Sequence, residues 1–304
     1  KKAKEERLED MIPCIACLQG CVTNMYAGKP LCCLTNPFLG HEAEPLEKAE
    51  EPKKVMVIGG GVAGLSAAFI AKERGHEVTL YEAGDVLGGN MRLAAYPPGK
   101  GDITNMIRNY IHRCQKDGVK IVMNCEVTPE LIKEEKPDSV IIATGSKTLI
   151  LPIEGIDNPA IIHGSDLLDG KRAAGKKVLV VGGGMVGCET AAFLGEQEHD
   201  VTVIEFRDTV GADVIHEHRV YLMKDFEDYG IKEITGAKVC KFYEDGVEYE
   251  TADGVRHESR GYDSVILSMG FRNYNPLEEK IGDAIRTRRA LDATKEAYEV
   301  ASRI

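Results

Sequence analysis

Residues 55–64 read VMVIGGGVAG, four apolar residues followed at once by a glycine-rich turn. A short apolar run that stops at glycines predicts a buried β-strand. In the G-x-G-x-x-G pattern of Gly59, Gly61 and Gly64, the first glycine permits a tight turn and the second lets the backbone approach a pyrophosphate. The third lets a helix pack on the strand, and the N-terminus of that helix attracts phosphates. This stretch therefore predicts a strand, a turn and a helix that bind a dinucleotide.

The same pattern occurs a second time, 123 residues later, as VLVVGGGMVG at residues 178–187. In both copies an acidic residue, Glu82 or Glu205, lies 18 positions after the last glycine, where it can accept hydrogen bonds from ribose hydroxyls. One such turn alone is often only structural. Two copies, each with strand, helix and acid at matching positions, favour two bound dinucleotides. The glycines of the second copy are Gly182, Gly184 and Gly187.

The composition is that of a globular protein with about two domains. The 304 residues are 43% hydrophobic and 29% charged, and the formal net charge is −11. Because an acidic chain repels phosphates and anionic lipids, we expect no nucleic acid and no membrane as partner. Nine cysteines without a secretory signal favour a reducing, cytoplasmic location. Since the sequence begins at Lys1 rather than Met, we expect a piece of a longer protein.

Five cysteines are concentrated near the N-terminus, at Cys14, Cys17, Cys21, Cys32 and Cys33. Three thiolates in the spacing C-x2-C-x3-C can converge on one small object, and a fourth completes a ligand set that suits zinc or a [4Fe–4S] cluster. A compact triplet with a distant fourth cysteine favours the cluster, while zinc and unligated thiols stay open as alternatives. The other cysteines are isolated, which disfavours a flavin-to-disulfide mechanism; they are Cys114, Cys125, Cys188 and Cys240.

The rest of the sequence alternates further helices and strands. We expect helices at residues 1–10, 102–116 and 292–303, strands at 119–123, 139–143 and 265–267, and a β-meander at 239–251 and 257–260. The prediction is an α/β protein with two Rossmann-like dinucleotide-binding domains after a cysteine-rich segment.

Several motifs together resemble the iron–sulfur branch of the Old Yellow Enzyme family, which includes 2-enoate reductases, 2,4-dienoyl-CoA reductase and trimethylamine dehydrogenase. The motifs are PCIACLQGC at 13–21, AGKP at 27–30, CLTNP at 33–37, GGNMRLAA at 88–95, PPGK at 97–100 and ATG at 143–145. The family spacing C-x2-C-x3-C-x11-C implies that Cys14, Cys17, Cys21 and Cys33 hold a [4Fe–4S] cluster, with Cys32 as a spare neighbour that could substitute for Cys33.

The resemblance implies that the chain is divided into three parts. Residues 1–48 would hold the end of a barrel helix and the cluster; residues 49–160 and 261–304 would bind FAD; and residues 161–260 would be an inserted NAD(P)-binding domain. The implied FAD residues are Gly59, Gly61, Ala63, Gly64, Glu82, Gly89, Asn90, Arg92, Lys100, Val127, Gly145 and Asp283. Asn90 stands where relatives often carry Gln. The implied nicotinamide residues are Gly182, Gly184, Gly187 and Glu205. A strand normally precedes the Gly282–Asp283 pair, so we expect a few residues to be missing near Ile281.

By the same resemblance, NADH would reduce FAD, and electrons would pass through the cluster to an FMN barrel of the full-length protein, which reduces an activated C=C bond. That barrel is absent here, so no catalytic residue of the substrate reaction is expected in this chain. We expect NAD rather than NADP, because Glu205 would repel a 2′-phosphate, although Arg207 could soften this preference. A homo-oligomer is possible.

Two other functions stay open. In a module like that of trimethylamine dehydrogenase, ADP would be bound as a scaffold and electrons would leave to a protein acceptor. In a non-enzymatic nucleotide sensor, the cysteines would hold a structural metal.

Overall fold

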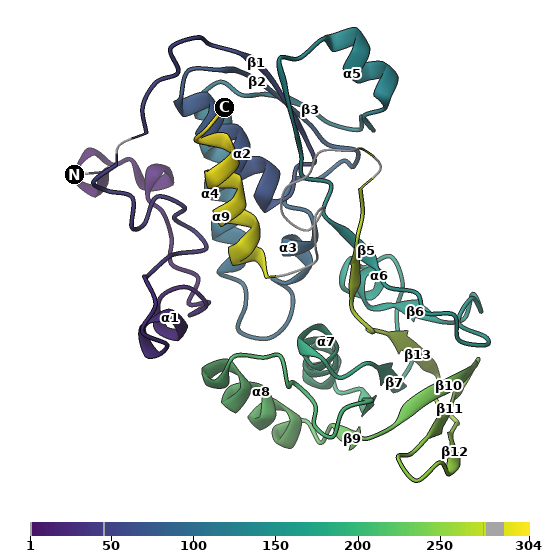
Figure 1. Ribbon diagram of the computed structural model, residues 1–304. Helices are drawn as coiled ribbons and strands as arrows, with labels where there is room; N and C mark the ends of the chain where they lie inside the picture. The colour runs from purple at the N-terminus through teal and green to yellow at the C-terminus, as the bar shows by residue number, and fades with distance from the viewer. Residues whose placement is uncertain (1, 45, 276, 278–288) are drawn as a thin grey trace. The chain divides into compact units, whose positions relative to one another are not determined.

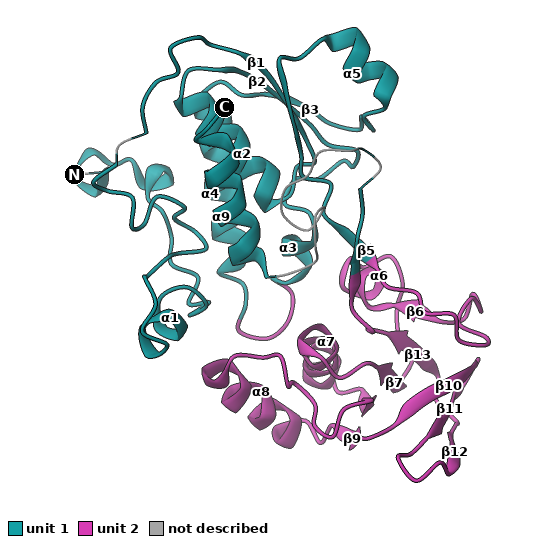
Figure 2. Cartoon of the chain, viewed as in Figure 1, with its two compact units in different colours: residues 1–95, 100–147, 272–304 teal, residues 96–99, 148–271 magenta. Residues whose placement is uncertain are grey.

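The computed structural model describes residues 2–44, 46–275, 277 and 289–304. The chain forms two compact units (Figure 2). Unit 1 comprises residues 1–95, 100–147 and 272–304, and unit 2 comprises residues 96–99 and 148–271. Unit 2 is thus inserted into the chain of unit 1. The predicted Gly282–Asp283 pair, with Asp283 as an FAD residue, lies outside the described residues, as does the segment around Ile281.

Unit 1 contains a four-stranded parallel sheet in the order β3-β2-β1-β4. Its strands are β1 (Lys54–Ile58), β2 (Glu77–Tyr81), β3 (Lys120–Val122) and β4 (Ser139–Ile142). The helices of this unit are α1 (Val22–Tyr26), α2 (Val62–Glu73), α3 (Asn90–Leu93), α4 (Ile103–Lys116), α5 (Pro129–Glu135) and α9 (Ala290–Ala301). The expected helices at 102–116 and 292–303 are therefore confirmed as α4 and α9.

The strand β1 is apolar throughout because both faces of its sheet are covered. Val55 and Val57 belong to the core formed with α2, α4 and α9, which lie side by side in Figure 1. Met56 and Ile58 belong to a second cluster that includes side chains of α5. The helix α2 is buried from Val62 to Ala71, which explains its lack of a polar face.

Unit 2 contains a five-stranded parallel sheet in the order β6-β13-β7-β8-β9. Its strands are β6 (Ile162–His163), β7 (Lys177–Val181), β8 (Asp200–Ile204), β9 (Lys232–Ile234) and β13 (Ser264–Leu267), and its helices are α6 (Gly164–Leu168), α7 (Met185–Glu196) and α8 (His216–Asp228). One face packs on α7 and α8. The other face packs on the expected β-meander, which is confirmed as β10 (Lys238–Tyr243), β11 (Gly246–Glu250) and β12 (Arg256–Ser259). The strands β5 (Ser146–Thr148) and β14 (Phe271–Asn273) carry the chain out of unit 1 and back, and pair with each other.

The sequence repeat is also a repeat of structure. The bounds of β7, α7 and β8 lie 123 residues after those of β1, α2 and β2 at both ends of every element. Both copies are β-α-β units in which a helix joins two parallel, paired strands. The predicted pair of Rossmann-like units is confirmed.

The prediction of a helix at residues 1–10 is wrong. Two short 3₁₀ helices, Lys2–Glu5 and Leu8–Asp10, are present instead, and the backbone between them is left-handed at Glu6, with φ 56°. Asp10 forms an ion pair with Lys116 at 2.5 Å, and its Oδ1 lies 3.0 Å from Nε2 of His112; both partners are on α4. These tertiary contacts override the local helix propensity of a charged segment. Within the described residues, no helix combines the length and the apolar character needed to span a membrane.

Candidate functional site

The two glycine turns leave their strands in the same way. Gly59 has φ 108° and Gly182 has φ 103°, values that favour glycine. The N–H of Gly59 donates to the carbonyl of Tyr81 at 2.8 Å, and the N–H of Gly182 donates to the carbonyl of Ile204 at 2.9 Å. Each turn then continues directly into α2 or α7, so the start of each helix lies beside the carboxyl ends of its parallel strands, where open α/β sheets bind ligands.

Two glycines of each turn are required by the fold itself. A Cβ on Gly59 would lie 2.3 Å from the carbonyl oxygen of Ala143, and one on Gly64 would lie 1.8 Å from that of Gly59. The corresponding distances are 2.4 Å for Gly182, to Ser268, and 1.8 Å for Gly187, to Gly182. No side chain fits at these four positions, whether or not a ligand binds.

The middle glycine of each turn is different. A Cβ on Gly61 would meet nothing closer than the Cα of Gly89 at 4.0 Å, and one on Gly184 would meet nothing closer than the carboxylate of Asp213 at 3.5 Å. Their φ values, −73° and −72°, are ordinary for any residue. Packing therefore does not explain these glycines. A pyrophosphate that approaches the backbone at the start of the helix does, so the turns fit the dinucleotides implied by the sequence.

The two acidic residues support the glycine turns directly. Glu82 Oε2 accepts the N–H of Gly60 at 2.6 Å, and its Oε1 accepts the N–H of Gly84 at 2.7 Å. Glu205 accepts the N–H groups of Gly183 at 2.6 Å and Arg207 at 3.0 Å. A carboxylate has about four acceptor sites. Both residues can therefore hold their loop in place and still accept ribose hydroxyls.

The other proposed FAD residues of unit 1 fall into two groups. Ala63 lies in the first turn of α2, and Gly89 faces the turn, because its own Cβ would lie 3.1 Å from the Cα of Gly61. Asn90 begins α3 and donates its amide to Ser146, to the carbonyl at 3.2 Å and the hydroxyl at 3.3 Å. These residues adjoin the glycine turn.

The second group is less closely tied to the turn. The Val127 side chain is buried in the cluster around β1, so only its main chain is available to a ligand. Gly145 has φ 71° and accepts the N–H of Tyr274 at 2.9 Å. Arg92 is part-buried on α3, and Lys100 is part-buried before α4.

The cysteine segment folds around two strained turns. Ala16 and Leu18 have φ 51° and 55°, which is uncommon for residues with a side chain, and they flank Cys17. Burial raises the pKa of Cys17, and the charges of Cys33, Cys21 and Cys14 raise it further. Cys32 instead accepts the amide of Asn24 at 3.4 Å.

Four thiols are the donor set that an iron–sulfur cluster takes. However, the described residues contain no group of three or more His, Cys, Asp or Glu side chains arranged to hold a metal. The donor chemistry that a cluster requires is nevertheless present in this segment. All nine cysteines are free thiols, and burial raises the pKa of both Cys114 and Cys188 to about 12. A buried thiol whose pKa is raised is a weak nucleophile at neutral pH.

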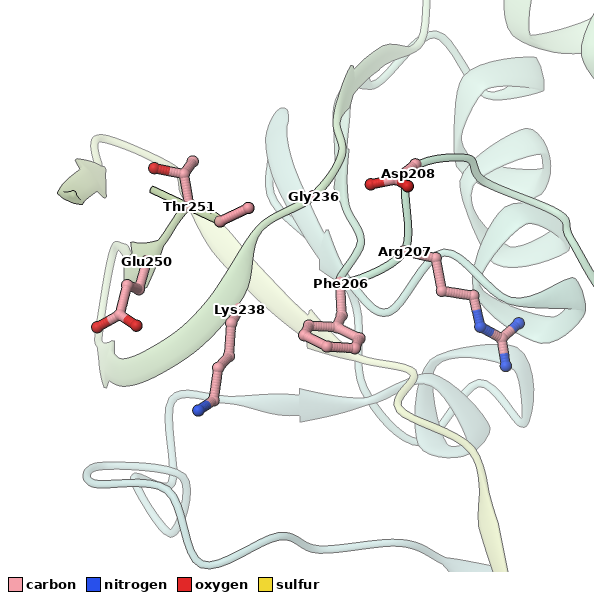
Figure 3. Close-up of a pocket in the computed structure, with 8 residues that line it drawn as sticks. Phe206, Arg207, Asp208, Gly236, Lys238, Glu250 and Thr251 are labelled. Atoms are coloured by element: carbon pink, nitrogen blue, oxygen red, sulfur yellow. The ribbon is translucent and has the colours of Figure 1, made fainter. Parts of the chain in front are cut away.

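A pocket of about 470 Å³ follows the acidic end of β8 in unit 2 (Figure 3). In that view the ring of Phe206 lies between the side chains of Arg207 and Lys238. Phe206 is 69% exposed. The sequence did not indicate this pocket, because part of its lining comes from the β-meander, which is distant in sequence from the end of β8. The lining residues are Phe206, Arg207, Asp208, Gly236, Lys238, Glu250, Thr251 and Ala252.

Asp213 is another feature of unit 2 that the sequence analysis did not indicate. Its Oδ1 accepts the N–H of Met185, the first residue of α7, at 2.8 Å. The signal was available, because the 123-residue offset places Asp213 opposite Asn90 of unit 1.

Comparisons with known proteins agree with this geometry. Residues 43–300 match the family model described as pyridine nucleotide-disulphide oxidoreductase. Over 317 residues the chain is 33% identical to the cinnamate reductase of Clostridium sporogenes, covering 100% of this chain and 47% of that protein. It is 34% identical to the NADH oxidase of Thermoanaerobacter brockii, covering 100% of this chain and 49% of that protein.

Among solved structures, a 2-naphthoyl-CoA reductase superposes over 100% of this chain and 48% of its own, with a TM-score of 0.94 and 32% identity. Thioredoxin reductase from T. acidophilum, at 19% identity and a TM-score of 0.62, shares the fold. The chain spans about half the length of the curated relatives it matches. The resemblance to enoate reductases inferred from the sequence is confirmed by these relatives. The chain belongs to the pyridine nucleotide-disulphide oxidoreductase family, whose members are enzymes.

Proposed function

We propose that this chain is the electron-input module of a flavin and iron–sulfur oxidoreductase. In this proposal NADH is the donor, and the acceptor is an activated C=C bond of an enoate, enoyl-CoA or enone, reduced in an FMN barrel of the same full-length protein. Relatives named cinnamate reductase and 2-naphthoyl-CoA reductase support the substrate class. Their length, about twice that of this chain, leaves room for such a barrel.

The observation that carries the proposal is the space at Gly61 and Gly184, which packing does not require. Unit 1 would hold FAD on the turn of Gly59, Gly61 and Gly64, with Glu82 on the ribose. When bound, FAD would supply the change from hydride pairs to single electrons, which a nicotinamide cannot make, and a [4Fe–4S] cluster on Cys14, Cys17, Cys21 and Cys33 would carry those electrons.

Unit 2 would hold the nicotinamide dinucleotide on the turn of Gly182, Gly184 and Gly187. The pocket beyond Glu205 would take the adenosine end, with the exposed Phe206 ring available for stacking on a base. Glu205 favours a 2′-hydroxyl, whereas Arg207 and Lys238 at the same pocket favour a 2′-phosphate. Because Glu205 is held by two main-chain N–H groups, we propose NAD as the preferred donor.

The test is an anaerobic absorbance spectrum of the purified chain after reconstitution with FAD, iron and sulfide, followed by titration with NADH and then NADPH. The proposal expects flavin bands over a broad iron–sulfur absorbance, and bleaching by NADH at lower concentration than by NADPH. A protein that binds FAD but is reduced by neither nucleotide would contradict it.

A second candidate is a module in which ADP is a scaffold and electrons leave to a protein acceptor. The carboxylate of Asp213 at the start of α7 favours it, because this charge opposes a phosphate there. So does the 28% identity to N,N-dimethylglycine/sarcosine dehydrogenase of Chromohalobacter salexigens. This candidate expects ADP in unit 1 and no response to either nicotinamide. A nucleotide sensor would bind nucleotide without flavin colour or labile sulfide.

A further inference from the structure

The two glycine turns differ at one pair of corresponding positions. The structural repeat continues beyond β2 and β8: the N–H of Gly88 donates to the carbonyl of Gly60 at 2.8 Å, and 123 residues later the N–H of Gly211 donates to that of Gly183 at 2.7 Å. Two residues after this shared bond, unit 1 has Asn90 and unit 2 has Asp213. Corresponding positions of the repeat therefore carry a neutral amide in one unit and a carboxylate in the other, although Asn90 begins a helix and Asp213 lies in a turn.

The two side chains also have different partners. Asn90 donates to Ser146. Asp213 Oδ1 accepts the N–H of Met185 at 2.8 Å, and both of its oxygens lie 3.5 Å from the position that a Cβ on Gly184 would take. That position is the space that the proposed function assigns to the pyrophosphate. A carboxylate is an anion like the phosphate, and both are stabilised by the N–H groups and dipole at a helix start.

The backbone around Asp213 is held in place while its side chain is exposed. Val210 and Val214 on either side are buried, at 0% and 9% exposure, and Arg219 donates to the carbonyl of Val210 at 3.1 Å. Asp213 itself is exposed to solvent. A side-chain rotation can therefore release the N–H of Met185 without a movement of the loop.

We propose that Asp213 is an internal competitor for the dinucleotide in unit 2, and that it sets the affinity of this turn for a nicotinamide nucleotide. The inference rests on the proposed function of the turn. In the free protein the carboxylate caps α7. The pyrophosphate replaces it at the N–H of Met185, and the displaced negative charge remains close to the bound phosphates. Asp213 thus stabilises the free protein and weakens binding.

Asp213→Asn and Asp213→Ala test this inference. The asparagine keeps an acceptor for Met185 and removes the charge, whereas the alanine removes both. Glu227→Gln, which removes an exposed charge on α8, is the control for net charge. NADH affinity is measured by fluorescence titration of the FAD-loaded chain, and melting temperature is measured without NADH. We expect the dissociation constant for NADH to fall about tenfold in both Asp213 variants and to stay unchanged in the control.

The melting temperature of the free protein is expected to fall in Asp213→Ala, because α7 loses its cap. A lower melting temperature together with tighter NADH binding is not expected if Asp213 has a purely structural role. If wild type binds NADH and Asp213→Asn binds it equally or less tightly, the inference is wrong and the proposed function stands. If neither protein binds NADH, the proposed function of unit 2 is wrong and the inference falls with it. If Asp213→Asn binds NADH and the wild type does not, the inference is supported, because the carboxylate alone then prevents binding.

The reciprocal change, Asn90→Asp, tests the correspondence between the two turns. It would add a negative charge next to Gly89, whose own Cβ would lie 3.1 Å from the Cα of Gly61, and we expect FAD affinity to fall about tenfold. Unchanged FAD affinity would contradict the correspondence, because the two positions would then not face equivalent ligand atoms.

Discussion

Replacing the middle and the last glycine of one turn should separate the requirements of binding from those of folding. In Gly61→Ala the new methyl group has 4.0 Å of clearance and an ordinary φ of −73°. Its effect on stability should be within about 1 kcal/mol, since alanine restricts the unfolded chain but is a poor N-cap. This corresponds to a change in melting temperature of about 2–4 °C for a domain of this size.

FAD binding should respond far more strongly to the same methyl group. It would occupy the space of the pyrophosphate and remove at least one hydrogen bond between the backbone and a charged oxygen, worth about 1.5–3 kcal/mol. The dissociation constant for FAD should therefore rise roughly 10- to 100-fold. In Gly64→Ala, by contrast, the methyl group would lie 1.8 Å from the carbonyl oxygen of Gly59. Overpacking of this kind costs about 1–3 kcal/mol or more.

The assay pairs thermal melting with FAD titration, and Gly184→Ala is the matched control in the other unit. Gly184→Ala should keep its affinity for FAD and lose its response to NADH. Gly61→Ala should lose affinity for FAD and keep its affinity for NADH. If Gly61→Ala binds FAD like the wild type, the space at Gly61 is not the pyrophosphate site. If both variants lose both nucleotides, the turns are coupled through folding and the steric reasoning is refuted.

Three further predictions concern other parts of the chain. Glu205→Gln should lower the preference for NADH over NADPH about tenfold, measured as the ratio of the two dissociation constants, because it removes the charge that repels a 2′-phosphate; an unchanged ratio would assign the choice to Arg207 and Lys238. Cys33→Ser should lose most bound iron and labile sulfide, whereas Cys32→Ser should keep both, and equal loss in the two variants would contradict the ligand set. Lys116, His112 and Arg7 hold the pKa of Asp10 well below its usual range, so its contribution to stability is complete at neutral pH and disappears as the pH falls below about 4. The melting temperature of Asp10→Asn should accordingly lie below that of the wild type at pH 7 and approach it in acid, and a gap that persists in acid would exclude this linkage.

The repeated β-α-β unit could be predicted from the sequence because its determinants are local. Glycine spacing, apolar runs and the acid 18 residues later all lie within about thirty residues, and the structure reproduces them at both ends of each element. The segment at residues 1–10 was misjudged because its conformation depends on contacts with α4, about a hundred residues away.

The candidate site was only partly accessible from the sequence for the same reason. The pocket at Phe206 needs Lys238 and Glu250 from the meander, and no spacing rule joins these to the end of β8. Asp213 is an exception, since aligning the two copies beyond β8 would have placed it opposite Asn90. Cys32 and Cys33 are adjacent in sequence, and only the structure separates their partners, Asn24 for one and Thr35 for the other.

The insertion of unit 2 into unit 1 has a consequence for synthesis on the ribosome. The helix α9, at residues 290–301, packs against α2, at residues 62–73, and Lys53 donates to the carbonyl of Ile304 at 3.0 Å. Unit 1 is therefore started first but completed last, after the whole of unit 2 has been made. During that interval the largely apolar helix α2 lacks the part of its cover that α9 supplies, and an exposed apolar surface of this kind promotes aggregation. Premature termination after residue 271 and before α9 leaves a chain in which the later unit is whole and the earlier one is not.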